Sequence, residues 1–250
     1  MQFENKVALV MGGSSGIGRA TAIKFAEQGA DVVIAARRST EGEAVAQEIR
    51  DSGGGAMFVK ADVTQAEQVE AAVEQTVSTF GSLDMAFNNA GLLAALGPPH
   101  EIEEDAWDRE IDVNLKGVWL CLKYEIRQML AQGGGSIVND SSAGGLKGAS
   151  KADPYSAAKH GVTGLTKSAA LEYAPHGIRV NAVCPGSVET PMTKPMYDDP
   201  DLKSRIISAH PIGRVGNPKE FAEAVTWLCS DSASFVTGIA MPVDGGYIAK

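Results

Sequence analysis

Short apolar segments rich in β-branched residues alternate with longer helix-like segments along the whole chain. The apolar segments predict seven strands, over 6–11, 31–36, 56–60, 83–87, 136–140, 178–183 and 239–243. The segments between them predict helices near 16–28, 41–52, 66–80, 101–130, 154–173 and 218–230. Nearly continuous apolar strands are typical of a parallel sheet with helices on both faces, joined by right-handed crossovers. We therefore expect an α/β fold over residues 1–250: a single Rossmann-like, doubly wound parallel sheet flanked by helices.

Residues 186–217 depart from this alternation. Four prolines and a glycine surround one short helical piece there. Long irregular segments in compact domains are often functional. We expect a small substrate lid over about 187–212.

The composition of the chain argues against several classes of binding partner. The chain has 22 basic and 31 acidic side chains, a formal net charge of −9, which argues against a nucleic-acid or membrane partner because both attract clustered Lys and Arg. We expect neither a signal peptide nor a transmembrane helix, because no apolar run in the sequence is long enough for either. Three cysteines without a Cys-x-x-Cys pair, and histidines without ligand spacing, predict neither disulfides nor a metal site. We expect a soluble, reduced, cytoplasmic protein.

The first strand leads directly into a glycine-rich loop, Gly12-Gly13-Ser14-Ser15-Gly16-Ile17-Gly18, and then into a helix. Glycines let the backbone approach a pyrophosphate, and the helix start offers unpaired N–H groups to it. The same loop contains Gly-x-Ser-x-Gly, the nucleophile elbow of α/β-hydrolases, with Ser14 as nucleophile. We favour a dinucleotide site, because the loop follows the first strand and no histidine ends a later one. A Ser14 esterase is the alternative.

The end of the second predicted strand bears on which dinucleotide binds. An NAD site usually has an acidic residue there, about 20 residues after the glycine loop, which hydrogen-bonds the ribose hydroxyls of the cofactor. This chain has Arg37 and Arg38 instead. Guanidinium groups suit a 2′-phosphate, so we predict NADP, with NAD as a possible second cofactor.

Tyr155 and Lys159 stand four residues apart, on one face of a predicted helix. Asp153 followed by Pro154 predicts the N-cap and first residue of that helix. A cation one turn away and the positive helix end both favour a phenolate. We therefore expect a lowered pKa for Tyr155, which would suit it to acid–base catalysis.

Several motifs together resemble the short-chain dehydrogenase/reductase family over the whole chain. In chain order they are Gly12-x-x-x-Gly16-Ile17-Gly18, Asn88-Asn89-Ala90-Gly91, Asn114, Ser141-Ser142, Tyr155-x-x-x-Lys159 and Pro185-Gly186. The resemblance implies an oxidoreductase that transfers a hydride between NADP(H) and a ketone or secondary alcohol. It also implies a homotetramer.

The resemblance further implies a role for each matching residue. Tyr155 would exchange a proton with the substrate oxygen, which Ser142 would hydrogen-bond. Lys159 would lower the pKa of Tyr155 and hold the nicotinamide ribose, and Asn114 would keep a water relay behind Lys159. The cofactor-binding residues would be Gly12, Ser14, Ser15, Gly16, Ile17, Gly18, Arg37, Arg38, Asp62, Val63, Asn89, Ala90, Gly91, Tyr155, Lys159, Pro185, Gly186, Val188 and Thr190.

Two residues depart from the family pattern. Met11 stands where a threonine usually opens the glycine motif, for which we expect an adjustment of packing. Asp140 stands two residues before Ser142, where an uncharged residue is common. The sequence does not reveal its partner, and a buried carboxylate would perturb neighbouring pKa values.

The substrate pocket is the least readable part of the sequence. Apolar side chains from three predicted loops could form its wall and favour a neutral, moderately hydrophobic ketone or alcohol: Leu92, Leu93, Leu96, Leu146, Met192, Met196 and Tyr197. They could equally pack against the protein or a second subunit.

The helices near 114–130 and 154–173 are apolar on more than one side, and we place Val118, Trp119, Leu122 and Ile126 on one of these sides. Two functional alternatives stay open: an NAD(H)-dependent or dual-cofactor dehydrogenase, and a non-catalytic dinucleotide sensor.

Overall fold

Seven strands form one parallel sheet in the computed structural model, which describes all 250 residues. The strand order is β3-β2-β1-β4-β5-β6-β7, and every neighbouring pair is parallel. The strands are β1 (Val7–Met11), β2 (Asp31–Ala36), β3 (Ala56–Lys60), β4 (Met85–Asn88), β5 (Gly135–Asp140), β6 (Ile178–Pro185) and β7 (Ala240–Val243). The order reverses direction between β1 and β4, where doubly wound folds bind ligands. The predicted Rossmann-like fold is confirmed.

Nine α-helices connect or extend these strands: α1 (Gly16–Glu27), α2 (Ser39–Asp51), α3 (Ala66–Phe80), α4 (Glu104–Ile111), α5 (Gly117–Gln132), α6 (Asp153–Tyr173), α7 (Lys194–Tyr197), α8 (Pro200–Ala209) and α9 (Pro218–Cys229). Short 3₁₀ turns are η1 (Pro99–Glu101), η3 (Ala143–Gly145), η4 (Ala174–His176) and η5 (Asp231–Ala233), and η2 (Asp112–Lys116) is a π-turn. No helix is both long and apolar enough to span a membrane.

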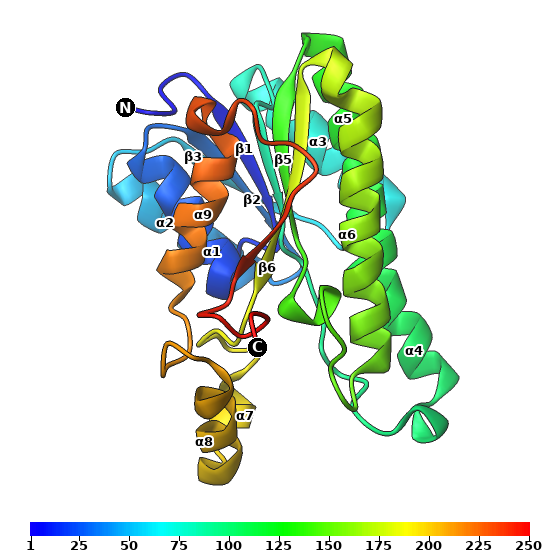
Figure 1. Cartoon of the computed structure of the whole chain (residues 1–250). Helices are drawn as coiled ribbons and strands as arrows, with labels where there is room; N and C mark the ends of the chain where they lie inside the picture. Colours follow the sequence, from blue (N-terminus) through cyan, green and yellow to red (C-terminus); the bar gives the residue numbers. More distant parts are fainter.

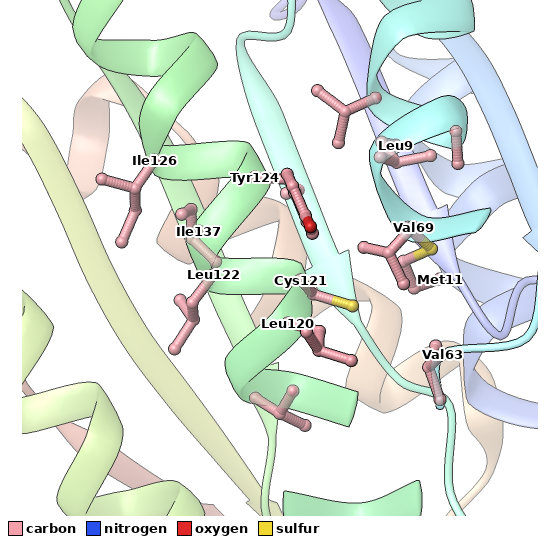
Figure 2. Packing of buried hydrophobic residues seen from close by; sticks show 14 of the residues in the cluster. Leu9, Met11, Val63, Val69, Leu120, Cys121, Leu122, Tyr124, Ile126 and Ile137 are labelled. Carbon is pink, nitrogen blue, oxygen red and sulfur yellow. The ribbon is translucent and has the colours of Figure 1, made fainter. Parts of the chain in front are cut away.

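The helices form a layer on each face of the sheet, with α1, α2 and α9 on one side and α3, α5 and α6 on the other (Figure 1). Alternate residues of each strand point to opposite layers. Val10 and Ile34 pack with Phe25 of α1 and Val225 of α9. Residues such as Leu9, Met11 and Ile137 pack with helices α3 and α5 on the other face (Figure 2). Both faces are therefore core, which explains the continuous apolar strands.

Several segments differ from the sequence prediction. The predicted helix over 101–130 begins only at Glu104, after the separate turn η1, and contains the π-turn η2. The fourth strand begins at Met85, because the Asp84 side chain accepts hydrogen bonds from Val7 N and Ser82 Oγ and ends the preceding turn. The segment expected to hold one short helical piece holds two helices, α7 and α8, which extend beyond the sheet (Figure 1).

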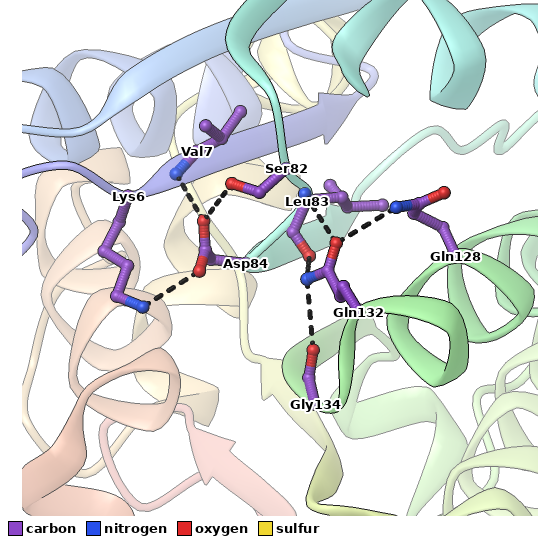
Figure 3. Close-up of polar contacts among 8 residues, drawn as sticks. All are labelled: Lys6, Val7, Ser82, Leu83, Asp84, Gln128, Gln132 and Gly134. Atoms are coloured by element: carbon purple, nitrogen blue, oxygen red, sulfur yellow. Dashed lines mark hydrogen bonds and ion pairs between the residues drawn. The ribbon is translucent and has the colours of Figure 1, made fainter. Parts of the chain in front are cut away.

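A polar network joins the strands at their amino ends (Figure 3). Asp84 accepts three hydrogen bonds, from Lys6 Nζ at 2.9 Å, Val7 N at 3.0 Å and Ser82 Oγ at 2.7 Å. Beside it, the Gln132 amide at the end of α5 accepts from Leu83 N at 3.1 Å and donates to Leu83 O at 2.8 Å. These bonds hold β1, β4 and α5 together at the amino end of the sheet, opposite to the end where the glycine loop lies.

Candidate active site

A single cleft lies across the carboxyl ends of the strands. Its lining contains every site residue predicted from the sequence except Gly18 and Asn114. The lining comes from the carboxyl ends of the strands and the loops after β1, β2, β3, β4, β5 and β6, from η2 and from the first turns of α6. Residues that are far apart in the chain, such as Gly16 and Thr190, meet there because all the strands are parallel.

The glycine loop packs tightly against the loop after β4. Gly12 has a φ of +86°, and a Cβ atom on it would lie 2.6 Å from Ala90 N, so no other residue fits without displacing backbone. Gly18 lies beneath this contact, where a side chain would meet Gly12 O and Asn89 Nδ2. Asn89 Nδ2 also donates to Gly12 O at 3.0 Å. The two loops therefore form one rigid floor, with Gly18 supporting it from outside the cleft.

The start of α1 faces this floor with its backbone donors. Ser15 is the N-cap residue, yet its side chain accepts no capping hydrogen bond, and the first turn holds no acidic residue. The first N–H groups of a helix have no partner within the helix and carry a partial positive charge. This end of the cleft is suited to an anion.

Arg37 and Arg38 occupy different positions at the end of β2. Arg38 Nη2 donates to Ser15 Oγ at 2.7 Å and to Ser14 Oγ at 3.2 Å, so its guanidinium lies over the glycine loop. It also forms an exposed ion pair with Glu41 at 3.5 Å. Arg37 is exposed, lines the cleft and forms no ion pair within the chain. The two guanidiniums and two hydroxyls therefore form a cationic, donor-rich corner.

Ser142, Tyr155 and Lys159 lie together at the other end of the cleft. Ser142 caps the turn η3, where its Oγ accepts from Gly144 N at 3.0 Å. Tyr155 is in the first turn of α6, and Lys159 follows one turn later with its Nζ 5.5 Å from the centre of the Tyr155 ring. Lys159 is 1% exposed and donates to Asp140 O at 2.6 Å.

The pKa of Tyr155 differs from the sequence prediction. Burial of the phenol raises its pKa more than Lys159 and the neighbouring Ser142 hydroxyl lower it, and the Asp140 carboxylate adds to the rise. The prediction of a lowered pKa for Tyr155 was therefore wrong. It considered the cation and the helix end, whereas desolvation of the phenolate is the larger effect.

The start of α6 also corrects a prediction. Ala152 occupies the N-cap position, Asp153 is the first helical residue and Pro154 the second. The Asp153 side chain makes no capping bond, and its Oδ2 is buried without a partner. The expected cap fails because the helix begins one residue earlier than Pro154 suggests.

Asn114 lies outside the cleft lining and is fully buried. It sits within the π-turn η2, where the helix from α4 to α5 is widened by one residue. Its Oδ1 accepts from Leu92 N at 2.8 Å, and its Nδ2 donates to Leu92 O at 2.7 Å. Asn114 thus anchors the loop after β4. Such π-turns are frequent at functional sites.

The cleft lining contains one of the seven side chains suggested for a substrate wall, Met192. Leu92 is partly buried against the hydrophobic core, and Leu96 is largely exposed. Trp119 likewise points away from its predicted companions on α5, which are buried: Val118, Leu122 and Ile126. Loop side chains follow tertiary contacts that spacing alone does not reveal.

The sequence reasoning also missed several lining residues. These are Ala35, Ala36, Ala61, Val113, Asp140, Ser141, Pro191 and Thr193, of which Asp140 had been noted without a place in the site. Ser141 Oγ donates to Lys159 O at 2.9 Å and so holds the helix that carries Tyr155. Adjacency to Ser142 was the one signal that could have marked it.

Comparison with known proteins supports this geometry. Residues 12–248 match the family described as enoyl-(acyl carrier protein) reductase. The chain is 47% identical over 249 residues to cyclohexanol dehydrogenase of an Acinetobacter strain, covering 100% of this chain and 97% of that protein. It is 46% identical over 248 residues to cis-4-hydroxycyclohexanecarboxylate dehydrogenase of Sinomonas cyclohexanicum, covering 99% and 98%.

Solved structures agree with the sequence relatives. The structure of levodione reductase superposes with a TM-score of 0.95 at 38% identity and covers 99% of both chains. That of an actinorhodin polyketide ketoreductase with NADPH superposes with a TM-score of 0.92 at 39% identity, covering 99% of this chain and 98% of that one.

Proposed function

The chain belongs to the short-chain dehydrogenase/reductase family, and we propose that it is an NADP(H)-dependent oxidoreductase that interconverts a ketone and a secondary alcohol. One observation carries the proposal: a single cleft joins the glycine loop and the arginine pair to Ser142, Tyr155 and Lys159. A nicotinamide dinucleotide, when bound, supplies or accepts the hydride. Relatives that are named dehydrogenases and reductases of alcohols and ketones support the reaction class.

The residues of the cleft fit a phosphorylated dinucleotide. The free N–H groups at the start of α1 and the close backbone approach at Gly12 suit a pyrophosphate. The corner formed by Arg37, Arg38 and the Ser14 and Ser15 hydroxyls suits a 2′-phosphate, because guanidiniums and hydroxyls donate to its oxygens. The NADPH in the related ketoreductase structure supports the same choice.

The chain's own residues handle the proton and the substrate oxygen. Tyr155 donates its proton to the oxygen during reduction and accepts one during oxidation, while Ser142 hydrogen-bonds the same oxygen. Lys159 stabilises the phenolate, because its ammonium lowers the pKa of Tyr155 against the effect of burial. Asn114 holds the loop that closes the site behind Lys159.

The substrate that the cleft favours is a neutral cyclic ketone or alcohol. Two relatives are named for substrates with a cyclohexane ring. The cations that line the cleft are Arg37 and Arg38, at the glycine loop, and Lys159, which already contacts Asp140. No further cation lines the cleft to pair with a substrate carboxylate. We propose that residues 187–212 form the lid over this end, with Met192 touching the ring.

We extend the proposal to a homotetramer in the cytoplasm. Apolar side chains on the outer surfaces of α4, α5 and α6 support a subunit interface: Trp107, Trp119, Leu130 and Leu171. Three free, buried cysteines are consistent with a reducing compartment. Analytical ultracentrifugation tests the tetramer, and a monomer at micromolar concentration would contradict it.

Two alternatives make different predictions. A Ser14 esterase needs a histidine beside the hydroxyl, yet no histidine lines the cleft and Ser14 Oγ accepts from Arg38. A non-catalytic sensor would bind the dinucleotide and leave every ketone unchanged. An organophosphate label on Ser14 would favour the esterase over the oxidoreductase.

Cofactor choice is tested by removing the arginines one at a time. We expect Arg37→Ala and Arg38→Ala to weaken NADPH binding about 10- to 100-fold, since hydrogen bonds to charged groups contribute about 1.5–3 kcal/mol. NADH binding should change little. Arg19→Ala is the matched control, because Arg19 pairs with Glu48 on the surface and does not line the cleft. Equal weakening of NADH and NADPH would contradict a 2′-phosphate site.

A further inference from the structure

Asp140 has an unusual environment for an aspartate. It ends β5 and lines the cleft, but its side chain is only 14% exposed. Its Oδ2 lies 3.5 Å from Lys159 Nζ, at the limit of hydrogen bonding, and its Oδ1 is buried without any partner. The backbone oxygen of the same residue accepts the short bond from Lys159. One residue thus holds Lys159 with its carbonyl and faces it with a poorly solvated carboxyl.

The groups around this carboxyl define what its charge can affect. Lys159 and Tyr155 face it from α6, and Cys184 faces it from β6. Burial raises the pKa of the Cys184 thiol to about 11, so this group stays neutral near pH 7. Glu110 on α4 acts on Tyr155 but is held by Ala94 N and Ala95 N. The charge of Asp140 therefore acts mainly on Lys159 and Tyr155.

Building on the proposed function, we propose that Asp140 is a positioning residue that holds Lys159 and, through its own charge, tunes the pH at which Tyr155 transfers a proton. When Asp140 is ionised, its charge offsets that of Lys159 and disfavours the Tyr155 phenolate. When it is protonated, Lys159 acts on Tyr155 alone. Burial supports this switch, since it raises the pKa of Asp140 to about 6 although Lys159 opposes the rise.

The first test needs no substrate. Carboxyl ¹³C resonances of the full-length protein are titrated by NMR in the wild type, Asp140→Asn and Glu125→Gln. Glu125 is the matched control, because burial also raises its pKa, to about 7, but its partner is Asn88 at 3.0 Å. We expect a resonance titrating near pH 6 that is lost only in Asp140→Asn. In Lys159→Met the same resonance should titrate at a higher pH.

The second test is the pH profile of kcat for alcohol oxidation, which requires the phenolate. Asp140→Asn should move the acidic limb, on which kcat falls as Tyr155 becomes protonated, to lower pH by about one unit, because a negative charge near the phenolate is removed. Glu125→Gln should leave the limb in place. A purely structural role would lower kcat equally at every pH and would overturn the inference.

The two proposals can fail separately. If no ketone or alcohol is turned over but the Asp140 resonance depends on Lys159, the oxidoreductase assignment falls and the coupling stands. If the resonance near pH 6 persists in Asp140→Asn, or titrates at the same pH in Lys159→Met, the proposed coupling between Asp140 and Lys159 is wrong whatever the activity.

Discussion

The sheet has a lysine–aspartate pair at each end, and the two pairs differ in almost everything but their residue types. At the amino end, Asp84 receives three donors and lies 2.9 Å from an exposed Lys6 (Figure 3). At the carboxyl end, Asp140 lies 3.5 Å from a buried Lys159 and has one oxygen without a partner. Burial works against both carboxylates, but hydrogen bonds from Ser82, Lys6 and Val7 outweigh it only at Asp84.

This difference separates stability from function. The pKa of Asp84 is lowered, because its donors favour the charged form more than burial disfavours it. The pKa of Asp140 is raised to about 6, because burial dominates and Lys159 opposes it only in part. A fully satisfied carboxylate stabilises the fold, whereas a poorly satisfied one is left sensitive to proton exchange.

The largest expected effect lies at the carboxyl end. Tyr155→Phe should lower kcat about 10²- to 10⁴-fold, the usual contribution of a positioned acid or base. The midpoint of thermal unfolding and the binding of NADPH should remain close to the wild type, since only one hydroxyl is lost. Steady-state kinetics, calorimetry and cofactor titration check these outcomes. If the midpoint of thermal unfolding fell together with kcat, Tyr155 would contribute to stability as well as to catalysis, and the separation of the two would be contradicted.

Glu125 sharpens the comparison, because it is a buried carboxyl without a cation. It is 0% exposed, and burial raises its pKa to about 7, although the hydrogen bond from Asn88 lowers it in part. An acid whose folded pKa is raised loses stability as pH increases from its unfolded pKa to its folded pKa. Relative to Glu125→Gln, the wild type should therefore lose on the order of 3 kcal/mol between about pH 4.5 and pH 7. Urea unfolding of both proteins across this pH range measures the loss. If the free energy of unfolding of the two proteins changed with pH in parallel, the explanation by burial would be refuted.

Asp84 should show the opposite sign. Asp84→Asn should reduce the free energy of unfolding at pH 7 by about 1–2 kcal/mol, since a charged acceptor of several hydrogen bonds is lost. Because the folded pKa of Asp84 is lowered, its stabilisation is present above about pH 4 and disappears as pH falls further. The variant should therefore approach the wild type in acid. Unchanged kcat serves as the control, and a large loss of activity would contradict the separation of the two ends.

The smallest effect should come from the cation of the amino-end pair. Lys6→Met should cost less than about 1 kcal/mol, because Lys6 is half-exposed and such ion pairs contribute little. Most of the effect of Asp84 then belongs to Val7 N and Ser82 Oγ. A cost as large as that of Asp84→Asn in the same denaturation assay would assign the stabilisation to the ion pair instead.

Sequence reasoning succeeded where local geometry determines the outcome. The glycine loop could be predicted because Gly12 and Gly18 permit close backbone contacts that a side chain would block. The sheet could be predicted because both of its faces are apolar. The end of α5 at Gln132, where Gly133 follows with a φ of +93° that favours glycine, lies close to the predicted end of this helix at 130.

It failed where tertiary contacts decide. The π-turn around Asn114 leaves no trace in the hydrophobic period, and Asp153 resembled a helix cap although its carboxyl makes no capping bond. The partner of Asp140 is 19 residues away on another element, so the sequence could only mark the residue as unusual. The pKa of Tyr155 required knowledge of its burial as well as of Lys159.

The measurement that tests the central claim most directly follows absorbance of the reduced nicotinamide band in the wild type, with NADPH and NADH in parallel. Cyclohexanone and an open-chain ketone of similar size are the substrates. The account predicts oxidation of NADPH that depends on the ketone, is faster with the ring and is much slower with NADH. Equal rates with NADH would contradict the assignment of the arginine corner, and binding of NADPH without turnover of any ketone would contradict the oxidoreductase itself.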